Sequence, residues 1–374
     1  MTELNLLYTD VEDDLRRTIR DLLKDRLDPS AVIGMYDGDR TVVDPLWKAI
    51  AQDLGLAGLL IPEAEGGVGA SVREAAIVCE ELGRAVAPVP FLTSAVVATI
   101  AVAGSGHEVV AHLAAGATTA ALAVPFTTAP EGPLPALAAT DGALTGTVSS
   151  VAGALEADVL LVPVEESGGL AIYAVPVATT TVQAVASLDM SRQLADVSLD
   201  AAPGTRVRAD AADGVRAALR AGAAMLASEQ VGVASWCLAS TVDYLRERRQ
   251  FGRPVGSFQA LKHRLADLYV RVESGTAAAR YAAAALAADD SDAGVATAIA
   301  ASYCSNVAVT AAEDALQLHG GIGMTWEHPV HLYLKRAKTD QLAFGHPGEH
   351  RRRLADLVDL PLGSTEAGEG RVHE

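Results

Sequence analysis

Aromatic residues, cysteines and long hydrophobic runs are all scarce in this sequence of 374 residues. Only 4% of the residues are aromatic while 50% are hydrophobic, and alanine dominates long stretches. This composition favours closely packed helices over an aromatic-rich β structure. The three cysteines, Cys79, Cys237 and Cys304, lie far apart without a CxxC spacing. They predict neither a disulfide framework nor a zinc site, but buried thiols in a reducing cytoplasm.

Positive charge and membrane-length segments are lacking as well. The sequence has 29 Lys and Arg residues against 47 Asp and Glu residues, a formal net charge of −18. Nucleic acid and an anionic membrane surface are therefore disfavoured as partners, because two polyanions gain nothing from meeting. No apolar run approaches the roughly 20 residues of a membrane span, so we expect a soluble, cytoplasmic protein.

Several common enzyme signatures are also absent. The sequence contains no G-x-S-x-G elbow, no Walker loop and no H-E-x-x-H zinc pair. Hydrolase, NTPase and zinc-protease functions lose their usual support, and no metal site is predicted. His319 lies beside glycines, but a lone histidine is more often a packing residue than a base, and no partner for it is identifiable.

Helix and strand signals divide the chain into three parts. Capping-box spacings occur at Thr9 with Glu12 and at Ser71 with Glu74, and each begins a helical pattern. Near residue 117 the sequence pattern changes to short segments rich in Val and Thr. Near residue 211 it changes again, to long alanine-rich stretches. We predict an α+β protein with a helical domain at 1–116, a β domain at 117–207 and a helical bundle at 208–374.

The same signals bound individual elements. A further helix is predicted around 47–54. Strands are predicted over 143–151, 159–164, 170–177 and 179–186. Long helices are predicted over 215–248, 260–287 and 295–317.

Two polar clusters in the last part carry the strongest functional signal. The first, from Arg246 to Pro254, ends a predicted helix. Its arginines supply planar donor forks suited to a diphosphate, although a solvated helix end explains the same pattern. The second, from Gln317 to Met324, ends a helix at three glycines that permit close approach of another molecule. A helix C-cap explains it equally well.

Together, the two clusters and the order of helical, β and helical parts resemble the acyl-CoA dehydrogenase family over nearly the whole chain. R-R-Q-F-G-R-P at 248–254, followed by S-F-Q-A at 257–260, looks like the family's first C-terminal signature. Q-L-H-G-G-I-G at 317–323, with E-H-P at 327–329, resembles the second. The turn P-E-A-E-G-G-V-G at 62–69 is similar to a third family segment. The resemblance implies an N-terminal helical domain, a middle β-barrel or sandwich domain and a C-terminal four-helix bundle.

The resemblance also implies FAD as cofactor and names the residues that contact it. In the family, FAD lies between subunits, and the C-terminal domain of one subunit reaches the diphosphate and adenosine of the cofactor held chiefly by its neighbour. The first contact group would be Arg248, Gln250, Phe251 and Gln259. The second group would be Gln317, Gly320 and Gly321.

The catalytic base of the family is missing at both of its usual positions. Family members remove the α-proton of an acyl-CoA with a glutamate while the β-hydrogen leaves as hydride to the flavin. The commonest position, counted from Gln317, holds Phe344, and the alternative position, counted back from Arg248, holds Gly222. Neither residue takes a proton, so no catalytic residue is predicted. Glu229 and Glu349 are the carboxylates that could substitute after a loop shift.

The β domain departs from the family pattern as well. Where family members place a threonine-rich turn and a Trp-Thr pair around the flavin ring, this chain has V-P-F-T-T at 124–128 and S-S-V-A at 149–152. A chain that keeps the donated diphosphate contacts but loses the base and the ring contacts resembles the inactive subunit of actinobacterial α2β2 acyl-CoA dehydrogenases, which often act on steroid-derived CoA thioesters. Its implied partners are a second acyl-CoA dehydrogenase subunit, the acyl-CoA substrate and an electron-transfer partner.

Two other interpretations stay open from the sequence. One is a homomeric dehydrogenase that uses Glu229 or Glu349 as an unusual base. The other is a non-catalytic scaffolding relative that binds no flavin. The acyl group of the substrate is not encoded in any motif.

Overall fold

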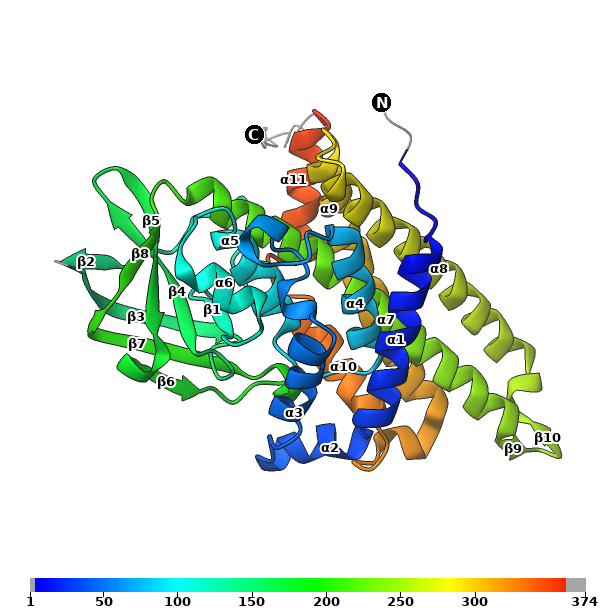
Figure 1. The fold of residues 1–374 in the computed structure, drawn as a ribbon. Coiled ribbons are helices and arrows are strands. Elements are labelled where there is room, and N and C mark those ends of the chain that lie inside the picture. Colours follow the sequence, from blue (N-terminus) through cyan, green and yellow to red (C-terminus); the bar gives the residue numbers. More distant parts are fainter. Residues whose placement is uncertain (1–3, 141, 361–374) are drawn as a thin grey trace, which may run out of the picture.

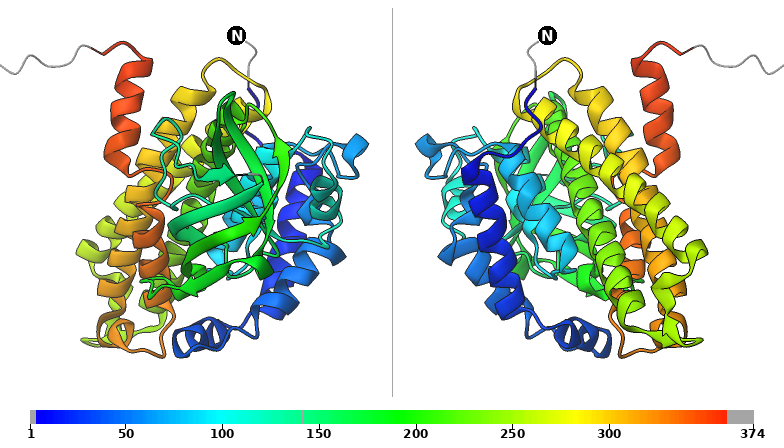
Figure 2. Two further views of the ribbon diagram at one scale, coloured as in Figure 1. Left: turned by 90° about the vertical axis from the view of Figure 1, so that its left-hand side faces the viewer. Right: turned by 90° about the vertical axis from the view of Figure 1, so that its right-hand side faces the viewer.

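In chain order a β region stands between two helical regions in the computed structural model, which describes residues 4–140 and 142–360. Figure 1 shows the β region at one end of the molecule. The predicted α+β architecture is confirmed. In Figure 2 the sheets face the viewer in the left view, with the N-terminal helices on one side and the C-terminal helices on the other. The limits proposed for the three domains stay a prediction.

The two longest N-terminal helices begin at capping boxes, as predicted. At α1 (Asp10–Arg26) the Thr9 side chain accepts from the Glu12 backbone N–H, and Glu12 accepts from the Thr9 N–H at 2.7 Å. Ser71 and Glu74 do the same at α4 (Val72–Arg84). The remaining helical elements are α2 (Pro29–Gly34), η1 (Met35–Asp37), α3 (Val43–Lys48), η2 (Ala49–Asp53), η3 (Leu56–Gly58), η4 (Glu63–Glu65), η5 (Phe91–Ala98), α5 (Thr99–Val102) and α6 (Glu108–Ala114).

The helix predicted around 47–54 is α3 continued by η2, which is a π-helix, as is η5. Short π segments are frequent at functional sites. Side-chain periodicity does not distinguish them from α-helix, so the sequence predicted neither. Both π segments are largely buried, and η5 forms one wall of the site described below.

Two four-stranded sheets form the β region. The first has the order β1-β4-β5-β8, with β1 parallel to β4, and the second has the order β2-β3-β7-β6 and is antiparallel. Leu144, Leu160 and Val197 come from both sheets and share one buried cluster, so the sheets pack face to face. The strands are β1 (Ala120–Leu122), β2 (Ala138–Thr140), β3 (Ala143–Ala152), β4 (Val159–Glu166), β5 (Gly169–Pro176), β6 (Thr181–Ala184), β7 (Leu194–Pro203) and β8 (Thr205–Arg208), with the short turns η6 (Val177–Thr179) and η7 (Met190–Arg192).

Helix α7 (Ala212–Glu247) is the central element of the last region and packs on α4, α8 and α9. It crosses α4 at two glycines that leave no room for a side chain. A Cβ on Gly83 would lie 2.1 Å from the Glu229 carbonyl oxygen, and one on Gly232 would lie 1.9 Å from that of Glu80. The other elements are β9 (Arg249–Gln250), β10 (Arg253–Pro254), η8 (Val255–Ser257), α8 (Gln259–Ala287), α9 (Ala293–His319), η9 (Gly320–Met324), α10 (Val330–Asp340) and α11 (Pro347–Leu357).

The stretch Ala293–Met324, which is α9 with η9, is long and apolar enough to cross a membrane by length and composition. We expected no such segment from the sequence. However, 72% of its most apolar window is buried inside the protein, as in the core helix of a soluble protein. The three cysteines are free and buried, as predicted.

A buried cluster of charges ties the β region to the C-terminal helices. Arg336 on α10 has no exposed surface. Its guanidinium donates to Asp189 at the start of η7, to Ser191 at 2.7 Å and to Glu229 on α7 at 2.5 Å. Arg192 of η7 donates to both oxygens of Glu229 and, at 2.7 Å, to Asp340. These contacts hold the β region, α7 and α10 together.

The cluster contains one carboxyl group more than it has guanidiniums. Asp189, Glu229 and Asp340 face Arg192 and Arg336, so the set is neutral only with one carboxyl protonated. Burial raises the pKa of Asp340 to about 8, and its Oδ2 is buried without a hydrogen-bond partner. For Glu229 burial acts in the same direction, but Arg192 and Arg336 lower its pKa below the ordinary value. Asp340 therefore carries the proton.

We predict that Asp340→Asn flattens the dependence of stability on pH. An Asp that keeps its proton to about pH 8 when folded, but releases it near pH 4 when unfolded, makes the free energy of unfolding fall as the pH rises between those values. Asn mimics the protonated form and has no proton to lose. In thermal melts from pH 5 to 8.5, the variant should gain Tm relative to the parent as the pH rises.

Asp189→Asn is the matched control for this prediction, because Asp189 is held ionised by Arg336 and lies in the same cluster. It should lower Tm throughout this pH range. If Tm changes with pH in the same way for the parent and for Asp340→Asn, the proton is not on Asp340.

Candidate functional site

The two predicted FAD-contact groups lie at one end of the C-terminal helices. Arg248 caps the C-terminus of α7, and Gln317 lies in the last turn of α9. Tyr244, one turn before Arg248, stacks on His319 with ring centroids 4.7 Å apart. His319 is buried and its Nδ1 bonds to the Ala315 carbonyl oxygen, so it is a packing residue, as expected. This stack holds the ends of the two helices together.

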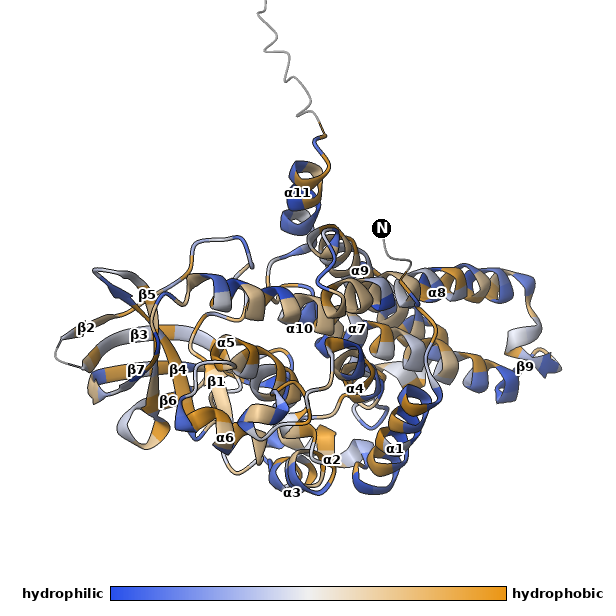
Figure 3. Cartoon of the chain, turned by 45° about the horizontal axis from the view of Figure 1, so that its top comes forward, coloured by the Kyte–Doolittle hydropathy of each residue, from blue (hydrophilic) through white to orange (hydrophobic). Residues whose placement is uncertain are grey.

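A short hairpin presents the first group to solvent. β9 pairs with β10, and the tip residues Phe251 and Gly252 both have positive φ, at 54° and 75°. A positive φ is uncommon outside glycine and is strained in a bulky residue. Phe251 is nevertheless 89% exposed. Figure 3 colours this end of the molecule mostly hydrophilic.

The second group presents backbone rather than side chains. Gly320 has φ 62° and an open side, because an added Cβ would meet nothing within 4 Å, and the same holds for the space beside Gly321. Gly323, in contrast, is required by packing, since its Cβ would lie 2.7 Å from the Leu316 carbonyl oxygen. All seven predicted contact residues are exposed: Arg248, Gln250, Phe251, Gln259, Gln317, Gly320 and Gly321. Exposed donors and open backbone fit the diphosphate and adenosine of a cofactor presented from outside the chain.

The two positions at which a base was sought meet each other in space. A Cβ on Gly222 would lie 2.9 Å from Cζ of Phe344 and equally close to Val97, so the Phe344 ring occupies the space that a side chain at 222 would need. Phe344 is buried with φ 52°, and its N–H donates to the Phe126 carbonyl oxygen at 2.8 Å. Its ring packs edge to face on Phe126. Apolar side chains fill the point where both positions converge.

The two β segments that stand where family members have their flavin-ring contacts, 124–128 and 149–152, border the same point. Phe126 donates its N–H to the Ser150 carbonyl oxygen at 2.9 Å, which brings 124–128 beside 149–152. The space left here is a cavity of about 20 Å³, lined by Thr93, Val97, Leu122, Val124, Phe126, Ala152 and Phe344. That is room for about one water molecule. A flavin ring does not fit beside these residues.

Neither of the two alternative bases, Glu229 and Glu349, brings a free carboxylate to this cavity. Glu229 is 2% exposed and is bound by Arg192 and Arg336. Glu349 caps α11, where its carboxylate accepts from the His346 N–H at 2.9 Å. One carboxylate is neutralised inside the ionic cluster, and the other is engaged at a helix start.

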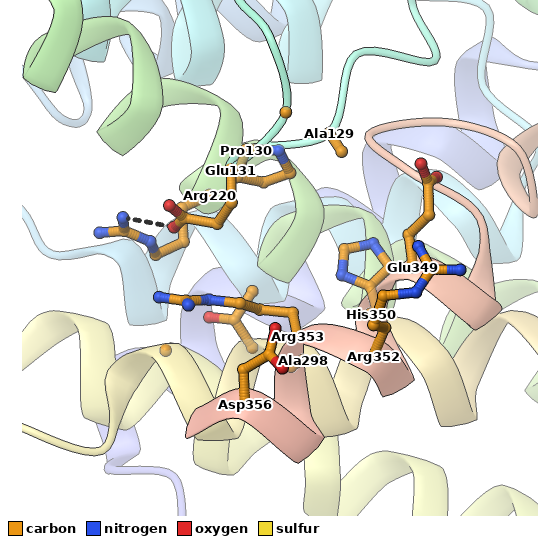
Figure 4. A pocket seen from close by; sticks show the side chains of 13 residues that line it. Ala129, Pro130, Glu131, Arg220, Ala298, Glu349, His350, Arg352, Arg353 and Asp356 are labelled. Carbon is orange, nitrogen blue, oxygen red and sulfur yellow. Dashed lines mark hydrogen bonds and ion pairs between the residues drawn. The ribbon is translucent and has the colours of Figure 1, made fainter. Parts of the chain in front are cut away.

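A pocket of about 380 Å³ lies on the other side of the Phe344–Gly345 turn (Figure 4). The loop 129–132, α7, the start of α9 and α11 line it. Arg220 pairs there with Glu131 at 2.9 Å, and Arg352 and Arg353 line it from α11. Sequence reasoning missed this pocket, although the run R-R-R at 351–353 was a visible signal.

The fold, with both signatures exposed at one end of the helices, defines the acyl-CoA dehydrogenases. The model of the acyl-CoA dehydrogenase N-terminal domain matches residues 9–112, and that of the C-terminal domain matches residues 213–358. The chain belongs to the acyl-CoA dehydrogenase family, whose members are oxidoreductases acting on CH–CH bonds.

Among its relatives is the acyl-CoA dehydrogenase IpdE2 of Mycobacterium tuberculosis, with 36% identity over 346 residues, 92% of this chain and 96% of that protein. The ChsE4–ChsE5 complex of M. tuberculosis superposes with a TM-score of 0.84 and 28% identity, over 96% of this chain and all of that chain. The Tcur3481–Tcur3483 steroid ACAD superposes with a TM-score of 0.81 and 27% identity, over 94% of this chain and 98% of that chain. A glutaryl-CoA dehydrogenase of M. smegmatis, solved with FADH2, shares the fold at 18% identity with a TM-score of 0.82, over 94% and 95%.

We predict that Phe344→Glu does not create an active homomeric enzyme. The new carboxylate would be buried against Phe126 and Val97, and the small cavity would hold neither a flavin ring nor a thioester. Misplacement of a reacting group by about 1 Å can already cost a hundredfold in rate. Rapid anaerobic mixing of the variant with acyl-CoA in excess FAD should give no flavin bleaching. Bleaching would show that the cavity opens and that the flavin site is intact.

Proposed function

We propose that this chain is the base-less subunit of an FAD-dependent acyl-CoA dehydrogenase of α2β2 composition. Its role is to complete the FAD site of a partner subunit that carries the catalytic glutamate. The observation that carries the proposal is the contrast between two regions of one chain. The cofactor-contact residues are exposed and ordered at one end of the helices, while the position of the base is sealed by Phe344.

The exposed residues would hold the distal half of the cofactor. Arg248 offers a planar pair of charge-assisted donors to a phosphate, and Gln250 and Gln317 add neutral donors and acceptors. The open side of Gly320 and Gly321 lets an adenosine approach the backbone closely. FAD, when bound, supplies the two-electron oxidation of the substrate's Cα–Cβ bond. This chain's residues bind and orient it.

The chain's own cavity argues for a partner. With Phe344 and Gly222 at the positions of the base, no side chain there can remove the α-proton of an acyl-CoA. The proton must pass to a glutamate on another subunit. The similarity to a chain of the ChsE4–ChsE5 complex and to one of the Tcur3481–Tcur3483 steroid ACAD supports a second acyl-CoA dehydrogenase chain as that subunit.

The substrate we propose is an acyl-CoA thioester of steroid origin. The support is the likeness to a steroid ACAD. An electron-transfer partner would reoxidise the flavin in the cytoplasm. The net charge of −18 agrees with the absence of nucleic acid and anionic membrane from the proposed partners.

A homomeric enzyme with an unusual base finds less support. Glu229 would have to give up its ion pairs with two buried guanidiniums, and breaking a buried ion pair costs about 3–5 kcal/mol. Glu349 would have to leave the cap of α11 and cross the Phe344–Gly345 turn. A flavin-free scaffold would have no use for the exposed arrangement of Arg248 and Phe251.

Co-expression tests the proposal directly. The chain expressed alone should be colourless and inactive on any acyl-CoA, even with FAD in excess. Co-purified with a base-bearing subunit, it should give a yellow complex that desaturates acyl-CoA. Turnover by a verified homomer would support the unusual base instead, and a colourless, inactive complex would support the scaffold.

We predict that Arg248→Ala lowers FAD occupancy of the assembled complex. Loss of a charge-assisted bond to phosphate costs about 1.5–3 kcal/mol, or roughly ten- to a hundredfold in Kd. Arg246→Ala is the matched control, because Arg246 is exposed two residues earlier and faces Asp243 at 3.8 Å. Flavin content per complex, read from the visible spectrum, should fall only for Arg248→Ala. Equal flavin content in the two variants would contradict the contact.

A further inference from the structure

Lys335, in the middle of α10, lies between two aromatic rings. Its Nζ is 3.9 Å from the ring centroid of Tyr36 and 4.2 Å from that of Trp326, and these two rings pack edge to face. Trp326 is 48% exposed and Lys335 is partly buried, so the amine remains open to solvent molecules on one side. Within residues 4–140 and 142–360, Lys335 forms no ion pair, whereas Lys338 pairs with Glu313 at 2.8 Å.

A histidine next to this lysine is held in the form that accepts a proton. The Nε2 of His331 lies 2.9 Å from the Trp326 carbonyl oxygen, which only accepts, so Nε2 carries the hydrogen. The Nδ1 lone pair is therefore free, and it faces the Lys335 Nζ at 3.2 Å. A nucleophile, an adjacent base and a third group that orients the base form the arrangement that activates nucleophiles in covalent catalysis.

The surroundings favour the neutral, nucleophilic form of the Lys335 amine. Burial lowers the pKa of the Lys335 ammonium, although Asp189 acts in the opposite direction. Burial also lowers the pKa of His331, so the imidazole is neutral near pH 7. The hydroxyl of Tyr36, whose pKa burial raises, stays protonated. A carboxylate that would keep the amine charged is missing from its immediate contacts in the described chain.

We propose that Lys335 is a site of N-acylation by acyl-CoA thioesters, with His331 as the base. The Nζ lone pair attacks the thioester carbonyl carbon, a C–N bond forms and the C–S bond breaks. The amine proton passes to Nδ1 of His331, and the leaving thiolate takes up a proton to become the free thiol. The products are an amide on Lys335 and the CoA thiol, with no oxidant or reductant required.

The inference goes beyond the proposed function, because it needs the thioester but not its desaturation. Transfer through a cysteine of this chain is not available, since Cys79, Cys237 and Cys304 are buried. Acylation replaces the ammonium by a neutral amide and removes both cation–π contacts. Trp326 lies shortly after η9, so its release would loosen the chain next to Gly320 and Gly321.

The test is acylation of the full chain by acetyl-CoA at pH 8, followed by peptide mass spectrometry. The sequence has only five lysines, Lys24, Lys48, Lys262, Lys335 and Lys338, so every site can be followed at once. Lys335 should be acetylated about tenfold faster or more than Lys262, which is exposed, and Lys338, which is paired. Equal rates at the three lysines would overturn the proposal.

His331→Gln separates base catalysis from mere exposure. It should slow acetylation of Lys335 by about tenfold or more, while the rate at Lys262 in the same sample stays unchanged and serves as the control for reagent concentration and pH. An unchanged Tm of the variant serves as the control for folding. The dehydrogenase activity of a complex does not enter this readout, so failure of the proposed function would not disturb it. An unchanged rate at Lys335 in this variant would show that His331 does not act as the base.

Discussion

The ion pairs of Arg336 are the constraint on which the arrangement around the site depends. An unpaired guanidinium in the interior would be too costly to tolerate, so α7, α10 and η7 must lie where Glu229, Asp189 and Ser191 reach it. This sets the path of the chain from α10 into the turn that carries Phe344. The guanidinium of Arg192 also lies 5.8 Å from the ring centroid of Phe126, so the cluster borders the aromatic pair directly. The interactions that organise the site thereby also withdraw Glu229 from chemistry.

Local patterns predicted the elements well, because their causes are local. The capping boxes at Thr9 and Ser71, the long alanine-rich helices and the four predicted strands lie within a few residues of the predicted limits, whereas β1, β2, β7 and β8 had no predicted limits. The arrangement of the site was harder to predict from the sequence. Counting along a family motif pointed to Gly222 and Phe344 separately, but only the folded chain shows that one ring fills the space beside both. Arg336 and its partners come from three segments far apart in sequence, and no periodicity predicts such a set.

The closed cavity at Phe344 and the exposed hairpin of β9 and β10 have a common physical basis. A catalytic cavity must keep an unpaired carboxylate and open space, both of which reduce stability. Once another subunit supplies the base, apolar packing such as Phe344 on Phe126 is favoured there instead. The hairpin of β9 and β10 shows the opposite balance, since Phe251 is 89% exposed with positive φ and packs only edge to face on Phe258 among the aromatic rings of the described residues. Such a residue persists when it serves contact with something outside the chain.

The fit of the Phe344 ring beside Gly222 also bears on the history of the chain. A side chain introduced at 222 while the ring is present would overpack the interior, at about 1–3 kcal/mol. Truncating the ring while 222 is still glycine would leave a void, at about 3–5 kcal/mol for Phe to Ala. Each single change at these two positions is thus opposed by the other residue. The pair behaves as an evolutionary ratchet, and a lineage that carries it is expected to keep both residues, because either change alone destabilises the fold.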